Sequence, residues 1–266
     1  MVEMPQVPSL DGRVALVTGA SRRMGIGAAV ARRLAVEGAR VFVHSWSPHD
    51  AEQPWGSDEG GADALIAELR AAGHGVAHRP ADFAHPDAPE GVVAATMAAF
   101  GRVDILVVNH ARSSSQDLEH LTASELDLSC AVNTRAALLL VKAFAAHHDG
   151  RTGGRVVLFT SGQHQGAMPA ELPYVASKAA LHQVAASLAA HLAPRGITVN
   201  CIDPGPTDTG YATAEVRALV ERRSLQRRWG HPDDAARLVA WLASDEARWI
   251  TGQLIVSDGG YALSGG

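Results

Sequence analysis

The sequence predicts an α/β protein built on one doubly wound parallel sheet with helices on both faces. Short β-branched and apolar runs alternate along the chain with longer segments whose apolar residues recur at helical spacing. A glycine-rich turn joins the first such run to the first helical segment. The 266 residues are 47% hydrophobic, which is enough for one large domain with a sizeable core. We therefore expect about seven parallel strands in a single domain over residues 1–266, with residues 1–10 as an N-terminal extension.

The expected strands are short runs of residues that favour β-structure. Val103 to Val108 (V-D-I-L-V-V) gives the strongest signal, and Arg13 to Thr18 (R-V-A-L-V-T) is a good first strand. In chain order, we expect strands at residues 13–18, 41–44, 75–79, 103–108, 155–160, 197–202 and 254–256.

The expected helices lie between these strands and carry recognisable end signals. The first follows the glycine turn and stops at Gly38, and Thr122 to Glu125 forms a capping box that opens a long helix. Two more begin near Pro173 and Pro232, because proline suits a first helical position. Further helical segments cover residues 62–72, 87–100 and 211–228. Residues 47–61 contain too much proline, glycine and acid for a long helix and should be loop-like.

The turn after the first strand has the features of a dinucleotide-binding loop. It reads G-A-S-R-R-M-G-I-G and stands between a strand and a helix. Glycines there let the backbone approach a pyrophosphate, and the helix N-terminus offers N–H groups and the positive end of a dipole. A plain strand-to-helix turn is the alternative, but the strand–turn–helix context favours cofactor binding.

Residues 161–178 (S-G-Q-H-Q-G-A-M-P-A-E-L-P-Y-V-A-S-K) carry the candidate chemistry. Tyr174 and Lys178 lie four apart, so a helix from Pro173 places the phenol and the ammonium on one face. An ammonium beside a phenol favours the phenolate and lowers the phenol pKa from about 10. Such a pair can exchange a proton with an alcohol oxygen, and Ser161 can hydrogen-bond the same oxygen. The alternative is a helix surface with an unremarkable Tyr and Lys, which the pattern Y-x-x-x-K alone does not exclude.

Two polar features inside helical segments leave two interpretations open. Asn133 stands in the apolar stretch A-V-N-T, so it is either buried with hydrogen-bond partners or placed on an exposed face. Residues 222–228 contain four arginines, for which a solvated helix face is favoured over a phosphate site.

Composition argues against several classes of protein. A net charge of −5 and a pI of about 6.2 argue against a nucleic-acid-binding surface. Cys130 and Cys201 lack metal-ligand spacing and no disulfide scaffold is expected, so a reducing cytoplasm is the expected location. No apolar run approaches the ~18 residues that span a membrane, and the N-terminus lacks the basic and apolar regions of a signal peptide. The scattered histidines contain no H-E-x-x-H, and no metal site is expected.

In order along the chain, these residues resemble the short-chain dehydrogenase/reductase family. Each motif is weak alone, but each stands at the expected strand end or on the expected helix. The matching residues are Thr18-Gly19 with Gly25-Ile26-Gly27, Asp82, Asn109-His110-Ala111, Asn133, Ser161, Tyr174 with Lys178, and Pro204-Gly205 with Thr209. The segments T-G-A-S-R, V-N-x-I-x-P-G and S-D-G-G are most similar to the bacterial 3-oxoacyl-(acyl carrier protein) reductase type. The resemblance implies a Rossmann-like fold over nearly the whole chain.

The resemblance also implies roles for individual residues. Tyr174 would be the general acid in carbonyl reduction and the base in alcohol oxidation, and Lys178 would lower its pKa and hold the nicotinamide ribose. Ser161 would polarise the carbonyl, and Asn133 would anchor a water that relays protons to Lys178. Asp82 would hold the adenine amino group. The residues implied to bind the cofactor are Gly19, Ser21, Arg22, Arg23, Gly25, Ile26, Ser45, Trp46, Asp82, Phe83, Asn109, Ala111, Tyr174, Lys178, Pro204, Gly205, Thr207 and Thr209.

Three departures from the family pattern affect these assignments. The glycine loop is two residues longer than T-G-x-x-x-G-x-G, so it must bulge between Gly19 and Gly25. Arg112 replaces the glycine that closes N-x-A-G, which puts a cation near the cofactor or substrate. Residues 47–61 form a longer loop than usual, and Trp55 within it could flank the adenosine end of a cofactor or pack on a neighbour.

We expect NADP(H) to be favoured over NAD(H). No acid stands at Ser45 or Trp46 to repel the additional phosphate, and both side chains can donate hydrogen bonds. Arg22 matches a position where related NADP-dependent enzymes carry a basic residue, and Arg23 adds a cation nearby.

The expected function is interconversion of a ketone, such as a 3-oxoacyl thioester, and a secondary alcohol by hydride transfer. A dehydrogenase for a sugar, cyclic ketone or polyketide-like substrate is one alternative. A non-catalytic NADP-binding regulator is another, which the complete catalytic set disfavours. Residues 207–230 should form a substrate lid, and the helices beginning near Thr122 and Pro173 should build a homotetramer or at least a dimer. No nucleic-acid or membrane partner is expected.

Overall fold

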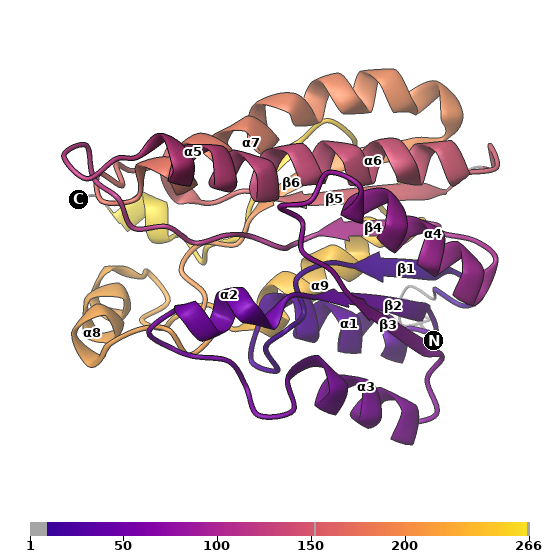
Figure 1. The fold of residues 1–266 in the computed structure, drawn as a ribbon, viewed down its shortest axis with the longest axis horizontal. Helices are drawn as coiled ribbons and strands as arrows, with labels where there is room; N and C mark the ends of the chain where they lie inside the picture. The colour runs from indigo at the N-terminus through magenta and orange to yellow at the C-terminus, as the bar shows by residue number, and fades with distance from the viewer. Residues whose placement is uncertain (1–9, 152, 265–266) are drawn as a thin grey trace, which may run out of the picture.

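The computed structural model describes residues 10–151 and 153–264, which form a seven-stranded parallel sheet (Figure 1). The strands lie in the order β3-β2-β1-β4-β5-β6-β7, and the predicted doubly wound fold is confirmed. Their bounds are β1 Val14–Val17, β2 Arg40–Ser45, β3 Val76–Pro80, β4 Ile105–Val108, β5 Gly154–Phe159, β6 Ile197–Asp203 and β7 Leu254–Val256. The order reverses between β1 and β4, which is where open parallel sheets bind ligands, beyond the carboxyl ends of the strands.

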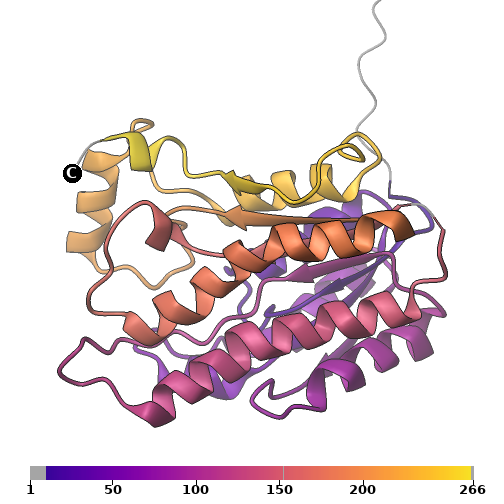
Figure 2. The same ribbon diagram turned by 90° about the horizontal axis from the view of Figure 1, so that it is seen from above.

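Helices cover both faces of the sheet (Figures 1 and 2). One face carries α1 (Ile26–Val36), α3 (Gly61–Ala71) and α9 (Pro232–Ala243), and the other carries α4 (Ala88–Phe100), α6 (Ala136–His147) and α7 (Leu172–Leu192). Successive strand residues point to opposite faces. Ala15 and Val17 therefore pack in the core under α1, while Leu16 and Phe42 pack in the core under α4 and α6.

The longest helical segment is interrupted by one π-helical turn. It begins with α5 (Ala123–Ser129), where the Thr122 hydroxyl accepts a hydrogen bond from the Glu125 N–H at 3.3 Å, as the capping box predicted. The π turn covers Cys130–Arg135, and α6 follows directly. The turn holds Asn133, which is fully buried, so the buried interpretation of this residue is confirmed. π turns inside α-helices occur frequently at functional sites.

The same helical segment corrects one expectation about apolar runs. Ala123–His147 is long and apolar enough to cross a membrane by length and composition, although no such run was expected. Half of its most apolar stretch is buried inside the protein. It packs against α4 and α7 in the second core cluster, so its surroundings are those of a core helix.

Two segments differ from their expected form. Within residues 47–61, a short helix α2 (Ser47–Glu52) precedes the turns, because Pro48 near its start is compatible with a first helical turn. Leu10 is fully buried and its N–H donates to the Glu37 carbonyl at 2.8 Å, so it belongs to the fold. The remainder of the expected 1–10 extension lies outside the described residues.

Two short helices stand beyond the carboxyl ends of the strands. α2 and α8 (Ala214–Arg223) both lie at that end of the sheet (Figure 1). The segment that contains α8 is closed at its base, because Thr207 pairs with Gly230 in an isolated bridge. The expected lid therefore leaves and rejoins the body of the protein at one point.

Candidate active site

A cavity of about 680 Å³ opens at the carboxyl edge of the sheet. This volume is within the range of small-molecule sites, about 300–1,000 Å³. Its walls are the glycine turn after β1, α2 with the turn after it, the segments after β4 and β5, and residues of the lid segment after β6. Strand ends that are far apart in the sequence therefore supply one site.

The glycine turn is held tightly against the end of β4. Gly19 has a φ of +73°, and a Cβ there would lie 2.5 Å from the His110 Cα. The Asn109 side-chain amide donates to the carbonyls of Thr18 and Gly19 at 3.1 and 2.9 Å. A Cβ at Gly27 would lie 2.4 Å from the Gly19 carbonyl oxygen. Glycine is thus required where the turn folds back on helix α1.

Two buried imidazoles and one phenyl ring form the floor beside this turn. His44 stacks on Phe83 with ring centroids 4.0 Å apart, and Phe83 meets His110 edge-on at 4.5 Å. His44 accepts from the Gly19 N–H and bonds the Ala81 carbonyl, so it links the glycine turn to the end of β3. Burial lowers the pKa of His44 to about 4 and holds the pKa of His110 well below its ordinary range. Both rings are therefore neutral near neutral pH.

Tyr174 lines the cavity from the first turn of α7. Burial of the hydroxyl raises the Tyr174 pKa to about 12, a hydrogen bond with Ser161 acts in the opposite direction, and the Glu171 carboxylate raises it further. Ser161 lies beyond the end of β5 and also lines the cavity. The pair therefore presents a protonated phenol and a hydroxyl to the same space.

Lys178 does not act on Tyr174 in the way its spacing predicted. Its side chain is buried on α7, and its ammonium donates to the Phe159 carbonyl at 2.8 Å. Burial lowers the Lys178 pKa to about 8, partly offset by the Cys201 thiol. The net effect on Tyr174 is a raised pKa rather than the expected lowered one, because desolvation of the phenol dominates.

Asn133 joins three segments behind the cavity. Its Oδ1 accepts from the Arg112 N–H at 2.6 Å, and its amide donates to the Arg112 carbonyl at 3.1 Å and to the Ser177 hydroxyl at 2.9 Å. The carboxamide thereby fixes the backbone that follows β4 against α7. These three hydrogen bonds give the side chain a positioning role between the segment after β4 and α7.

Helix α2 and the turn after it form a wall over the glycine turn. The Ser21 hydroxyl donates to Asp50 at 2.5 Å, and Asp58 accepts from the Arg23 N–H at 2.6 Å. The Arg22 guanidinium lies 5.8 Å from the Trp55 ring centroid. Its Nε stands 4.0 Å from an Asp58 oxygen, beyond hydrogen-bond distance. These contacts seat residues 47–61 on the two-residue insertion of the glycine turn.

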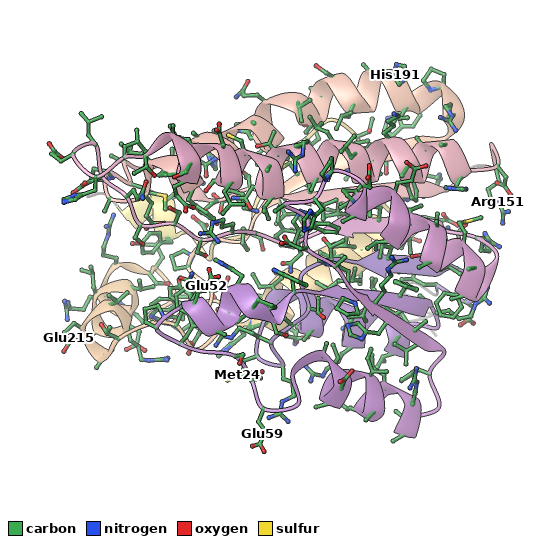
Figure 3. The ribbon with its side chains drawn as sticks, in the orientation of Figure 1. Met24, Glu52, Glu59, Arg151, His191 and Glu215 are labelled. Carbon is green, nitrogen blue, oxygen red and sulfur yellow. The ribbon has the colours of Figure 1, made fainter. Side chains whose placement is uncertain are left out.

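Arg112 connects α2 to α5 on the other side of the cavity. Its guanidinium makes a two-point contact with the Glu125 carboxylate at 2.8 and 3.0 Å. It also reaches Glu52 at 3.5 Å, and Figure 3 shows Glu52 projecting from α2. The His49 Nε2 accepts from the Ser113 N–H at 3.1 Å, which adds a second link between these segments. The cation that departs from the family pattern is therefore neutralised by carboxylates.

Aromatic side chains connect residues 207–230 to the wall of the cavity. Tyr211 meets Trp55 at 6.0 Å and Trp229 at 5.9 Å between ring centroids, each edge to face. The Trp229 indole N–H donates to the Arg217 carbonyl at 3.0 Å and fixes α8 to the base of the lid. At the same edge, Gly205 has a φ of +62°, and a Cβ there would lie 2.3 Å from the Asp258 Cβ.

The structure brings most of the predicted site residues to this cavity, but not all of them. Those that line it are Gly19, Ser21, Arg22, Gly25, Ile26, Trp46, Asp82, Phe83, Asn109, Ala111, Ser161, Tyr174, Pro204, Gly205, Thr207 and Thr209. Asn133 and Lys178 are buried behind the wall. Ser45 is buried with its hydroxyl bonded to His78 at 2.8 Å, and Arg23 lines a small depression beside α1 instead. Neither Ser45 nor Arg23 is among the residues that line the main cavity.

Sequence reasoning missed several residues that line the cavity. Asp50 and His49 come from residues 47–61, whose fold the sequence did not give. His110 belongs to the motif Asn109-His110-Ala111, but its ring contacts depend on the packing of three strands. Glu171 and Tyr211 also line the cavity. The position of Glu171 three residues before Tyr174 was the one available signal for it.

Comparison with known proteins agrees with this geometry. The chain matches the family described as enoyl-(acyl carrier protein) reductase over residues 19–262. An uncharacterised oxidoreductase of Bacillus subtilis is 38% identical over 251 residues, which cover 94% of this chain and 96% of the relative. A short-chain dehydrogenase from Burkholderia cenocepacia, solved in complex with NADP, is 38% identical with a TM-score of 0.84, covering 95% of this chain and 98% of its own.

A second solved structure is similar over almost the same span. It is a promiscuous reductase that catalyses a keto-reduction during lugdunomycin biosynthesis. It is 37% identical with a TM-score of 0.84 and covers 96% of this chain and 99% of its own.

Proposed function

The chain belongs to the short-chain dehydrogenase/reductase family, and we propose that it reduces a ketone to a secondary alcohol with NADPH. The observation that carries this proposal is the pairing of Tyr174 and Ser161 at the wall of a cleft lined by the glycine turn. A nicotinamide cofactor is the family's source of hydride. The protein's own contribution is a proton donor, an oriented hydroxyl and a partly enclosed cavity.

Tyr174 is suited to act as the proton donor in this reaction. With a pKa raised to about 12, its phenol stays protonated near neutral pH. It can therefore deliver a proton to a carbonyl oxygen as the oxygen gains negative charge. The Ser161 hydroxyl can donate a hydrogen bond to the same oxygen, which stabilises the developing charge. Oxidation of the alcohol would require the phenolate, which the raised pKa makes scarce near neutral pH.

The residues at the glycine-turn end fit a phosphorylated dinucleotide. The Arg22 Nε and the Trp55 Nε1 are both buried and have no hydrogen-bond partner within the described part of the chain. Two such N–H groups beside a glycine turn are suited to an anionic oxygen ligand. Asp50 and Asp58 stand nearby and oppose an additional phosphate. The proposed preference for NADPH therefore depends on Arg22 outweighing these two carboxylates.

The reaction is tested with a panel of ketones that includes 3-oxoacyl thioesters, cyclic ketones and polyketide-like quinones. NADPH consumption is followed for the wild type and for Tyr174→Phe. We expect turnover of at least one ketone class, lost by about 10²–10⁴-fold in the variant, with NADPH binding retained. Near-wild-type turnover in Tyr174→Phe would remove Tyr174 as the acid. Cofactor binding without turnover on any ketone would favour a regulator instead.

The cofactor preference is tested by kcat/KM with NADPH and NADH. We expect Arg22→Ala to lose roughly 30-fold of the NADPH preference, which corresponds to about 2 kcal/mol. Asp50→Asn should increase the preference, because it removes a carboxylate beside Ser21. Arg23→Ala is the matched control, since its side chain lies outside the cavity. Loss of the preference in Arg23→Ala alone would contradict this assignment, as would a wild type that prefers NADH.

We also propose a homotetramer, or at least a dimer, in a reducing cytoplasm. Small exposed residues along α7 (Ala176, Ala186 and Ala190) support close packing of that helix on a second copy. The free thiols of Cys130 and Cys201 are compatible with a reducing compartment. Sedimentation velocity at micromolar concentration tests the first proposal, and a purely monomeric species would refute it. Cell fractionation tests the second, and recovery outside the cytoplasm would refute it.

A further inference from the structure

Among the described residues that line the cavity, Glu171 has a carboxylate with neither a hydrogen-bond partner nor an ion-pair partner. Glu171 immediately precedes α7 and lines the cavity three residues before Tyr174. Its backbone N–H and carbonyl are bonded to Met168 and Val175. Among the described residues, no hydrogen bond or ion pair involves its carboxylate. Burial raises the pKa of this carboxyl, and no cation offsets the effect.

Glu171 and Tyr174 line the cavity from the start of the same helix, α7. Tyr211 lines the same cavity, and the Glu171 carboxylate raises the pKa of both tyrosines. Arg112, a cation that lines the same cavity, is already held by the Glu125 and Glu52 carboxylates. Arg112 is therefore not free to pair with the Glu171 carboxylate.

Aromatic and apolar side chains line the same cavity as that carboxylate. Tyr211 lines the cavity and belongs to the edge-to-face row with Trp55 and Trp229. Met168 and Leu128 line the same cavity. An aromatic ring beside a carboxylate is the chemistry that binds organic ammonium groups, because the ring face attracts a cation and the carboxylate pairs with its charge.

We propose that Glu171 and Tyr211 bind a positively charged group of the substrate, so that the preferred substrate is a ketone bearing a protonated amine. This inference rests on the proposed ketone reduction. An anionic substrate would meet the carboxylate in a partly desolvated site, where the charge repulsion is stronger than in water. Glu171 is thus a specificity-determining residue, since it would contact the substrate without exchanging a proton in the reaction.

Three ketones of one ring size separate charge from shape. They are a cyclic ketone with a protonated ring amine, the carbocyclic ketone, and the same ring carrying a carboxylate. We expect kcat/KM with NADPH to favour the amine over the carbocycle by about 10- to 100-fold at low salt. The preference should fall as salt is raised. The carboxylate analogue should be the poorest of the three.

Two variants of Glu171 and one control test the assignment to this residue. Glu171→Gln should reduce the amine-to-carbocycle ratio to near unity, and Glu171→Lys should reverse the order so that the carboxylate ketone becomes the better charged substrate. Glu215→Gln removes an exposed carboxylate of α8 that projects into solvent (Figure 3) and should keep the wild-type ratio.

The outcomes distinguish this inference from the function on which it rests. Reduction of all three ketones at similar kcat/KM by the wild type would overturn the inference and leave the ketone reductase intact. An amine preference that survives in both Glu171 variants would do the same. Failure of the wild type to reduce any ketone in the wider panel would overturn both.

Discussion

The raised pKa of Tyr174 makes the pH dependence of the two reaction directions the sharpest test of this site. The variable is pH, and the Tyr174→Phe variant, which lacks the phenol hydroxyl, is the control. An ordinary tyrosine is about half ionised near pH 10. With a pKa of about 12, only about 1% of Tyr174 would be phenolate at that pH. Reduction uses the phenol and should be nearly independent of pH across the neutral range, whereas oxidation uses the phenolate.

Alcohol oxidation should therefore rise about tenfold per pH unit from about pH 7 to pH 10 without levelling. The assay is initial-rate oxidation of the alcohol product with NADP⁺, beside reduction of the parent ketone over the same range. An ultraviolet titration gives a direct check, because the difference between the wild type and Tyr174→Phe isolates one of the three tyrosines of the chain. No phenolate of Tyr174 should appear below about pH 10.

A plateau in oxidation near pH 8 would refute this reasoning. It would mean that the Lys178 ammonium leaves the Phe159 carbonyl and stabilises the phenolate, as the four-residue spacing first predicted. A phenolate signal at that pH in the free protein would carry the same conclusion. The measurement thus decides whether burial or the Lys178 ammonium controls the pKa of Tyr174.

Three further predictions concern stability. Because the His44 pKa falls to about 4 in the folded state, the unfolded chain binds its proton first, and the free energy of unfolding should decrease by about 3 kcal/mol as pH falls from about 6.5 to 4. Thermal unfolding of His44→Gln should show a smaller acid dependence, while His191→Gln, on an exposed face (Figure 3), should match the wild type. Gly205→Ala should destabilise by about 1–3 kcal/mol more than Gly56→Ala in urea unfolding, since both have positive φ but a Cβ at Gly56 meets nothing within 4 Å; equal losses would argue against the clash. Asn133→Ala should cost about 2–4 kcal/mol through three lost hydrogen bonds, and a loss below about 1 kcal/mol would contradict its positioning role.

The sequence was sufficient for the fold because its signals are local. The apolar run at residues 103–108, the capping box at Thr122 and the proline at the start of α7 each act within a few residues. The glycine turn was recognisable in the sequence because only glycine fits at positions 19 and 27, where the backbone approach leaves no room for a side chain. In a parallel sheet the carboxyl ends of the strands lie at one edge. Residues predicted to follow the strands therefore lie together, and most of them line the cavity.

The orientation of buried polar side chains could not be predicted from sequence spacing. Lys178 lies on the predicted helix face, but its ammonium donates a hydrogen bond to the Phe159 carbonyl of β5. Ser45 follows the predicted strand, but β3 provides His78 as a partner, and the hydroxyl is turned from the cavity. In each case the deciding partner belongs to a strand distant in the sequence.

Two departures from the family pattern, which look independent in the sequence, form one structural feature. Arg112 and Glu52 are 60 residues apart, yet their side chains meet over the cavity. Arg112, which replaces the glycine of the family pattern, holds the 47–61 segment through Glu52. The Trp55–Tyr211 contact then joins the same segment to the lid. Because one wall spans from the glycine turn to Tyr211, the proposed cofactor preference and the proposed substrate charge selection would share a support. A change in the length of residues 47–61 would therefore alter both together.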